Sequence, residues 1–295
     1  MFTGSIVALI TPFRDGAVDK PTLRNLVRFH LENGTNGIVP CGTTGEAVTL
    51  TRQEWEQVIT VTIEEVDGRI PVIAGAGTND TAKTIDMTRY AKSAGADGAL
   101  IVTPYYNKPT QRGLIAHYTE IAQKVDIPLV VYTVPGRTGA NVLPETLAEL
   151  ARLDTIVAVK EASGDLEQIA LIGALCEDRI TILSGDDTLT LPILSVGGQG
   201  VISVVANIVP QDVARVVALY RAGQHDNALQ YFYRLLPLSK AMFIETNPIP
   251  VKTAAAILGL TGEDMRLPLI SMDASNRSRL TEALQSYGLM EEVFA

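Results

Sequence analysis

Eight short runs of apolar and β-branched residues, each followed by an amphipathic stretch, constrain the fold of this chain more than any other feature. The runs cover residues 5–12, 37–43, 70–77, 97–104, 127–134, 156–163, 180–187 and 200–207. Near-continuous apolar character is typical of parallel strands that helices cover on both faces. Eight such strand-and-helix units predict an α/β protein that closes into a (β/α)8 TIM barrel rather than an open doubly wound sheet.

The strand pattern stops near residue 208, and the rest of the chain has the periodicity of helices. Helical patterns cover residues 210–223, 225–243, 249–259 and 276–288. The first of these helices completes the barrel, and the others are surplus. We therefore expect a catalytic barrel over residues 1–224 and a C-terminal helical extension over residues 225–295. The extension should pack on the barrel, because no Gly/Ser-rich or Pro-rich linker separates the two.

Charge and cysteine content exclude several classes of function. A formal net charge of -9 at pH 7 argues against nucleic acid and anionic membranes as partners, because both bind basic patches. The apolar runs are far shorter than the roughly 20 residues that span a bilayer. Two cysteines, Cys41 and Cys176, are too few for a disulfide framework or a structural zinc site. Because the sequence also shows no secretory leader, we expect a cytoplasmic protein.

Polar segments follow the predicted strands, where the active sites of such barrels form. They are CGTTGE (41–46), GAGTND (75–80), TPYYN (103–107), YTVPGRTG (132–139), KEASGD (160–165) and SGDD (184–187). GAGTND lacks the third glycine of a dinucleotide-binding loop, and Asp186 and Asp187 have few acidic neighbours at other strand ends. All three histidines fall in helical patterns, which argues against a histidine-centred triad or metal site. We expect no cofactor and no metal ion.

Lys160 is the residue that most needs explanation, because it ends the apolar run IVAVK. Burial on a barrel strand removes water from the amine and favours its neutral form, which is the form that attacks a carbonyl to make a Schiff base. The alternative is a structural ion pair with Glu161 or Asp186. Strand alternation sends Lys160 and Glu161 to opposite faces, which weakens the simplest version of that alternative.

Hydroxyl groups and one arginine at neighbouring strand ends could serve such a lysine. Tyrosine and threonine hydroxyls can relay protons, although a buried tyrosine in a barrel is often simply packed with its hydroxyl satisfied. The glycine-bounded turn CGTTGE offers backbone N–H groups for a carboxylate, and its alternative is an ordinary turn. Arg137 could bind a substrate carboxylate through two hydrogen bonds, and its alternative is a surface or interface ion pair. The hydroxyl candidates are Thr43, Thr44, Tyr105, Tyr106 and Tyr132.

With these motifs the chain resembles the dihydrodipicolinate synthase family, within the class I pyruvate-dependent aldolases and lyases. The resemblance runs from FTGSIVALITPF through GTTGE, VTPYYNKP, VPGRTG, VKEASGD and LSGDD to NPIPVK, which is nearly the whole chain. It implies a Schiff-base lyase that condenses pyruvate with L-aspartate 4-semialdehyde to give 4-hydroxy-tetrahydrodipicolinate, the first committed step of lysine and diaminopimelate biosynthesis. GTTGE with KEASG is typical of the superfamily, and VPGRTG with TPYYN is more specific to this family.

The resemblance also implies roles for single residues. Lys160 would bind pyruvate covalently, while Thr43, Tyr132 and Tyr106 would relay protons, with Tyr106 reaching the active site of a neighbouring subunit. The implied assembly is a homotetramer, a dimer of tight dimers, and the main role of Tyr105 would be packing at the subunit contact.

Four further positions would bind substrate. Thr44 would help to hold the carboxylate of pyruvate, Arg137 would bind the carboxylate of the semialdehyde, and Gly185 and Ile202 would line the pocket through their backbones. Rival activities are those of N-acetylneuraminate lyase and of 2-keto-3-deoxy sugar-acid aldolases, or a barrel that binds a keto acid without turnover. Arg137 favours the semialdehyde, because a polyhydroxylated substrate would require partners for its hydroxyl groups instead.

The sequence departs from the family pattern in the region where lysine-inhibited members bind lysine. Lys83 stands where those members have a glutamate that holds the amine of the effector, so like charges would repel. We expect weak or absent feedback inhibition. Thr133, where many relatives have asparagine, is a second departure with no predicted consequence. The positions of that pocket read Ala47, Arg52, Trp55, Asn79 and Lys83 here.

Overall fold

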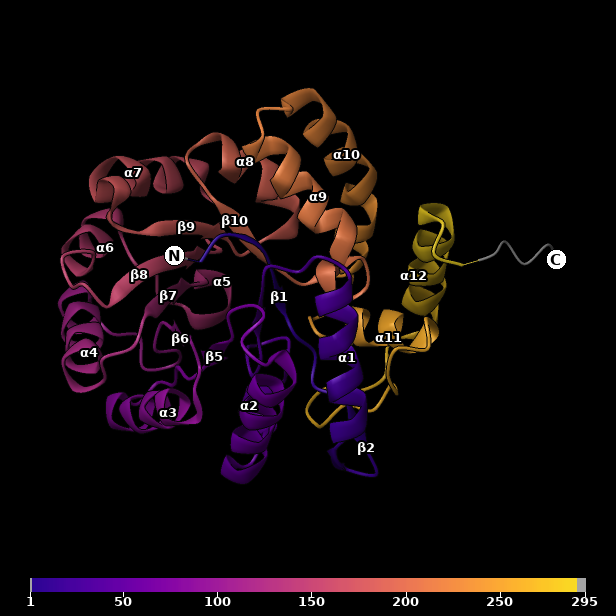
Figure 1. Cartoon of the computed structure of the whole chain (residues 1–295), viewed down its shortest axis with the longest axis horizontal. Coiled ribbons are helices and arrows are strands. Elements are labelled where there is room, and N and C mark those ends of the chain that lie inside the picture. Colours follow the sequence, from indigo (N-terminus) through magenta and orange to yellow (C-terminus); the bar gives the residue numbers. More distant parts are fainter. Residues whose placement is uncertain (1, 291–295) are drawn as a thin grey trace.

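Residues 2–290 are described by the computed structural model, which is a closed barrel of eight parallel strands surrounded by helices (Figure 1). The strands pair in the order β4-β1-β10-β9-β8-β7-β6-β5. The two ends of this order meet where Ile38 pairs with Val72 and where the Gly75 N–H donates to the Pro40 carbonyl over 3.0 Å. The predicted (β/α)8 barrel is confirmed: seven of the eight apolar runs contain a strand, and the first overlaps β1, which begins one residue earlier.

The barrel strands and the helices between them have the following bounds: β1 (Gly4–Ala8), α1 (Lys20–Glu32), β4 (Gly37–Val39), α2 (Arg52–Val66), β5 (Ile73–Gly75), α3 (Thr81–Ala94), β6 (Gly98–Val102), α4 (Gln111–Lys124), β7 (Leu129–Thr133), α5 (Pro135–Thr138), α6 (Pro144–Leu150), β8 (Ile156–Glu161), α7 (Leu166–Cys176), β9 (Thr181–Ser184), α8 (Thr190–Ser195), β10 (Gly200–Ser203) and α9 (Pro210–Arg221). A small antiparallel hairpin, β2 (Phe13–Arg14) with β3 (Ala17–Val18), follows β1, and single 3-10 turns occupy Ala47–Thr49, Glu177–Arg179, Asp187–Leu189 and Val205–Asn207.

Side-chain caps fix where several of the barrel helices begin. The Thr51 hydroxyl accepts the N–H of Glu54, and the Glu54 carboxylate accepts the N–H of Thr51 in return, which is a complete capping box at the start of α2. Asp80 and Thr110 cap α3 and α4 more simply, because their side chains accept the N–H of Lys83 and of Gly113. At the other end of α3, Gly95 takes a left-handed φ of 96°, which ends the helix. These caps determine where the helices begin and end between successive strands.

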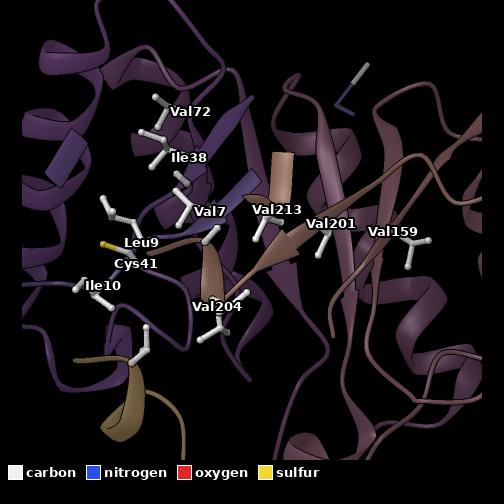
Figure 2. Packing of buried hydrophobic residues seen from close by; sticks show 14 of the residues in the cluster. Val7, Leu9, Ile10, Ile38, Cys41, Val72, Val159, Val201, Val204 and Val213 are labelled. Carbon is white, nitrogen blue, oxygen red and sulfur yellow. The ribbon is translucent and has the colours of Figure 1, made fainter. Parts of the chain in front are cut away.

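Alternation along the strands divides the core into two layers. One face of each strand points into the barrel, where Ile6, Ile73, Val130 and Ala158 pack together. The other face packs against the helices in a larger cluster, part of which is seen in Figure 2 with Val7, Ile38 and Val159 among its residues. Because the interior layer is filled with side chains, a ligand can enter only at an end of the barrel.

Three further helices follow α9: α10 (His225–Ala241), α11 (Ile249–Ile257) and α12 (Ala274–Tyr287). α10 packs against α8, α9 and α12, and α11 contacts the turn Val205–Asn207 at the end of β10. In Figure 1, α11 and α12 lie outside the ring of barrel helices. The last helices therefore reach the end of the barrel at which the polar strand ends lie.

Candidate active site

A cavity of about 430 Å³ opens at the C-terminal ends of the strands. Five different strand ends contribute to its wall, and the end of α10 and the segment before α11 complete it. Of the eight predicted site residues, six line it: Thr43, Thr44, Tyr132, Arg137, Lys160 and Gly185. A second cavity of about 250 Å³ shares Thr43, Tyr132 and Arg137 with the first and continues toward β5 and β6. Residues that the sequence scatters over 143 positions, from 43 to 185, thus surround one space.

Lys160 belongs to the interior face of the barrel. It follows Ala158 by two positions on β8, so both side chains point inward. The side chain is 6% exposed, and its amine lies 4.3 Å from the centroid of the Tyr132 ring. Tyr132 is its register partner on β7, and Leu183 is its partner on β9. The amine therefore sits at the bottom of the cavity, above the apolar interior of the barrel.

The carboxylates that could have neutralised Lys160 have other partners. Glu161 points away from the barrel axis and accepts hydrogen bonds from the N–H and hydroxyl of Ser163 and from the side-chain amide of Gln168, the last over 2.6 Å. Burial raises the pKa of Glu161, and the hydrogen bonds oppose that shift. Asp186 accepts both the N–H and the hydroxyl of Thr188. These bonds do not support the alternative of a structural ion pair for Lys160.

Thr133 continues the polar network behind the site. Its hydroxyl accepts the N–H of Val142 over 3.2 Å and donates to the side-chain oxygen of Asn141 over 3.1 Å. The Asn141 amide in turn donates to Gln168, which reaches Glu161. No consequence of Thr133 was predicted from the sequence. In the structure its hydroxyl helps to tie β7 to β8 on the helix side, directly behind Tyr132 and Lys160.

Gly185 lies where Ala162, the backbone of Glu161 and the side chain of Lys160 leave no room for a Cβ. A Cβ at this position would lie 2.7 Å from the Cβ of Ala162, 3.0 Å from the Glu161 carbonyl and 3.2 Å from Cε of Lys160. The Gly185 N–H donates to that same carbonyl over 2.6 Å, which draws the end of β9 onto β8. Glycine is therefore required for the close approach of two backbones beside the lysine.

The turn that follows β4 carries Thr43 and Thr44. Two backbone hydrogen bonds close it: the Gly45 N–H donates to Gly42 and the Glu46 N–H donates to Thr43, each over 3.1 Å. Thr43 is exposed and lines both cavities, whereas Thr44 is 3% exposed. The turn thus presents one free hydroxyl and one buried hydroxyl to the same space.

Arg137 and Thr44 meet at a residue to which the sequence assigned no role. Asn247 donates from its side-chain amide to the Thr44 hydroxyl over 3.1 Å and accepts from the Arg137 guanidinium at its backbone carbonyl over 3.3 Å. Its side chain is buried and lines the main cavity. Lys240 and Phe243, from the end of α10, line it as well. The NPIPVK motif belongs to the family resemblance, but nothing in the nearby sequence predicts that it packs beside the turn that carries Thr44, 203 positions away.

Two predicted site residues do not line the main cavity. Ile202 is fully buried in the barrel interior, and Val204 takes the place next to the cavity on that chain segment. Tyr106 lies on the loop between β6 and α4, is 90% exposed and has a left-handed φ of 72°. Its neighbour Tyr105 lines the second cavity. Tyr106 thus lies on the outer surface of the chain, away from the main cavity.

Arg52 makes most of the contacts in the region of Ala47, Trp55 and Lys83, where the sequence departs from the family pattern. Its guanidinium bridges Glu56 and Asp86 and lies 5.2 Å and 5.4 Å from the ring centroids of Trp55 and Tyr90. Trp55 is buried, and its indole N–H donates to the Gly75 carbonyl over 2.8 Å. Lys83 is exposed nearby in the first turn of α3. Arg52 is therefore neutralised by two carboxylates above a packed aromatic base, whereas Lys83 is exposed beside it.

Residues 2–290 contain neither a candidate metal-binding cluster nor a helix suited to span a membrane. No group of three or more histidine, cysteine, aspartate or glutamate side chains in this part of the chain could hold a metal ion. Within the same residues, no helix combines the length and the apolar character needed to cross a membrane.

Known proteins match this chain over nearly its whole length. The family model described as "Dihydrodipicolinate synthetase family" matches residues 1–287. A 4-hydroxy-tetrahydrodipicolinate synthase from Pelobacter propionicus is 56% identical over 98% of this chain and 100% of that protein. The crystal structure of dihydrodipicolinate synthase from Aquifex aeolicus superposes with a TM-score of 0.97 at 47% identity, covering 99% of this chain and all of that one. The chloride-inhibited enzyme from Acinetobacter baumannii, solved with pyruvate, matches with the same TM-score at 43% identity, covering 98% of this chain and all of that one.

Proposed function

The chain belongs to the dihydrodipicolinate synthetase family, and from this premise we propose how its own residues carry out the family reaction. The protein is a lyase that condenses pyruvate with L-aspartate 4-semialdehyde to give 4-hydroxy-tetrahydrodipicolinate in lysine biosynthesis. The full-length match carries this conclusion, and the buried lysine at the bottom of the cavity supplies its chemistry.

Lys160 is the nucleophile. Its neutral amine attacks the keto carbon of pyruvate, water leaves, and the resulting imine loses a methyl proton to become an enamine. The enamine carbon then attacks the aldehyde carbon of the second substrate. Because the product is a ring that contains the nitrogen of that substrate, the substrate amine must finally replace Lys160 at the former keto carbon. The same lysine is thereby released for the next turnover.

Proton transfers in these steps fall to hydroxyl groups. Tyr132 is in contact with the Lys160 amine through its ring, and Thr43 presents its hydroxyl to the same cavity. We assign to Thr43 and Tyr132 the relay that protonates the carbinolamine hydroxyl, which then leaves as water, and later the alkoxide that forms from the aldehyde. The carboxylates of Glu161 and Asp186 are not assigned to this relay, because both already accept hydrogen bonds from other residues.

Substrate carboxylates are held at two separate places. Thr44 and the adjoining backbone of the turn after β4 bind the carboxylate of pyruvate, which fixes the ketone against Lys160. Arg137, which lines the same cavity, binds the carboxylate of the semialdehyde. Gly185 provides the close wall that keeps the lysine in place, and Ile202 contributes to the apolar floor of the barrel beneath it.

The working assembly is a homotetramer in which Tyr106 completes the site of a second copy. Its 90% exposure and its left-handed φ support this role, because a tyrosine held outward in a rarely populated conformation needs a partner to contact. Leu171 and Leu175 on α7 support a second contact surface, since they lie one turn apart and are 46% and 43% exposed. Sedimentation velocity tests this assembly: Leu171→Glu should convert tetramers into dimers, and a monomeric wild-type protein would refute it.

Location and domain organisation follow the same reasoning. Cys41 and Cys176 are both unpaired and buried, which suits a reducing cytoplasm. We also retain the division into a barrel of residues 1–224 and an extension of residues 225–295. Contacts between Asn247 and Thr44 support an extension that acts as part of the barrel rather than as an independent unit.

A turnover assay with both substrates tests the proposed function. Purified protein should consume pyruvate only when L-aspartate 4-semialdehyde is present, and it should not cleave N-acetylneuraminate or a 2-keto-3-deoxy sugar acid at a comparable rate. Cleavage of either sugar acid with no condensation would assign the protein to a rival activity of the same superfamily. Binding of pyruvate without any turnover would indicate a non-catalytic barrel.

A further inference from the structure

Glu46 and Lys252 form an ion pair that is buried completely. Their side chains are 1% and 0% exposed, and the Lys252 ammonium lies 2.5 Å from Oε1 of Glu46. The same ammonium donates to the Asp264 carbonyl over 2.6 Å and lies 4.4 Å from the centroid of the Phe13 ring. The other carboxylate oxygen of Glu46 accepts the N–H of Arg266 over 3.2 Å. Every charge in the pair is therefore satisfied without water.

A buried ion pair of this kind adds little net free energy of folding. Removing two charges from water costs free energy that their attraction only partly returns, and well-packed apolar side chains often replace a buried pair without loss. Burial lowers the pKa of Lys252, and the carboxylate of Glu46 opposes that shift. What an ion pair provides and an apolar contact does not is a directed, short hydrogen bond that selects one arrangement.

Glu46 is the last residue of the turn that carries Thr43 and Thr44. Its backbone is left-handed, with φ 53° and ψ 35°, a conformation that residues other than glycine rarely adopt. Its N–H closes the turn by donating to the Thr43 carbonyl. A side-chain anchor at this position therefore fixes the end of the turn and, through it, the backbone of Thr43.

Lys252 and Asn247 hold this turn from one short segment of the chain. Asn247 precedes α11 and bonds to the Thr44 hydroxyl, whereas Lys252 lies in α11 and binds Glu46. The Lys252 N–H donates to the Pro248 carbonyl, which ties the two anchors together. The turn is thus fixed at two points, one beside the substrate and one behind it.

We propose that Glu46 and Lys252 are positioning residues for the pyruvate half of the site. They do not touch substrate, and they act by holding the turn so that Thr43 and Thr44 face the carbonyl and the carboxylate of pyruvate. This inference rests on the proposed roles of those two threonines. It assigns to the C-terminal helices a part in substrate binding that a barrel alone would lack.

Three variants test the proposal: Glu46→Gln, Lys252→Met and the double variant Glu46→Leu/Lys252→Met. In each, the KM for pyruvate should rise at least about tenfold and borohydride trapping of the imine should slow by a similar factor, because misplaced binding groups act on this step. The KM for the semialdehyde should change by less than about twofold, since Arg137 is untouched. The double variant should recover thermal stability relative to Lys252→Met but not the KM for pyruvate.

Leu284→Ala serves as the stability-matched control, because Leu284 is fully buried in α12, outside the cavity. It should lower the melting temperature and leave both KM values unchanged. Pyruvate kinetics that follow stability in all variants alike, or that stay within about twofold of the wild type in the double variant, would overturn the proposal. If a single variant does not fold, the double variant decides. Failure of the wild type to turn over would instead reject the proposed function.

Discussion

Tyr132 and Lys160 are register partners on the neighbouring parallel strands β7 and β8, and the Lys160 amine lies 4.3 Å from the centroid of the Tyr132 ring. Register partners in a parallel pair project to the same face of the sheet, so backbone pairing alone directs both side chains into the barrel. The proposed nucleophile and the proposed proton carrier are therefore positioned by strands rather than by loops. Little ordering remains to be done when pyruvate arrives.

Gly185→Ala should impair the reaction at the pyruvate step. The new methyl group would meet Ala162, the Glu161 carbonyl and Cε of Lys160, so the lysine or the strand must move. We expect kcat/KM for pyruvate to fall by about tenfold to a hundredfold. Gly136→Ala is the matched control, because nothing lies within 4 Å of its would-be Cβ, and it should keep wild-type kinetics. Equal effects of the two substitutions would contradict a specific role for Gly185.

Arg137→Lys should separate the two substrates. A lysine keeps the positive charge but loses the planar pair of donors that binds a carboxylate at two points. The KM for L-aspartate 4-semialdehyde should rise about tenfold or more, while trapping of pyruvate on Lys160 continues at the wild-type rate. Arg112→Lys, an exposed change in the first turn of α4, is the control. A loss of pyruvate trapping in Arg137→Lys would show that Arg137 acts in the first half of the reaction instead.

L-Lysine should not inhibit this enzyme appreciably. Lys83 is exposed where an amine-binding carboxylate would be required, and the Arg52 guanidinium lies between Glu56 and Asp86 beside it. An L-lysine titration of the steady-state rate should therefore be flat through the micromolar range. Inhibition at micromolar concentrations would contradict this prediction. In the variant Lys83→Glu, inhibition by L-lysine should be stronger than in the wild type.

Mild acid should destabilise the fold through His30. This side chain is fully buried, and burial lowers its pKa to about 3. The unfolded chain can bind the proton near pH 6.5 and the folded chain cannot, so stability from this group is complete above that pH and falls as the pH is lowered toward 3. The slope is about 1.4 kcal/mol per pH unit. Urea unfolding at pH 6.5, 5.5 and 4.5 should show a shallower decline for His30→Gln than for the wild type. Identical pH dependence in both proteins would contradict the assignment.

Much of the fold was predictable because its signals are local. Apolar runs such as residues 156–163 and caps such as Thr51 act within a few residues, and they sufficed for eight strands and a closed barrel. The inward direction of the Lys160 side chain was predictable for the same reason, because alternation along β8 alone determines it.

The remaining parts of the site depend on contacts between distant segments. Asn247 reaches Thr44 across 203 positions, and Lys252 reaches Glu46 across 206. Neither pairing leaves a periodic or compositional trace in the sequence. The hydrogen-bond chain from Thr133 through Gln168 to Glu161 was missed likewise, because its members are ordinary polar residues until β7 and β8 bring them together. Burial of a polar side chain is a tertiary property.

Borohydride trapping with pyruvate, read out by intact and peptide mass, tests the central claim most directly. The wild type should gain one pyruvate-derived adduct per chain, located on Lys160, and Lys160→Ala should gain none while keeping its fold. An adduct on another lysine, or an unmodified Lys160 in a sample that turns over, would contradict the account.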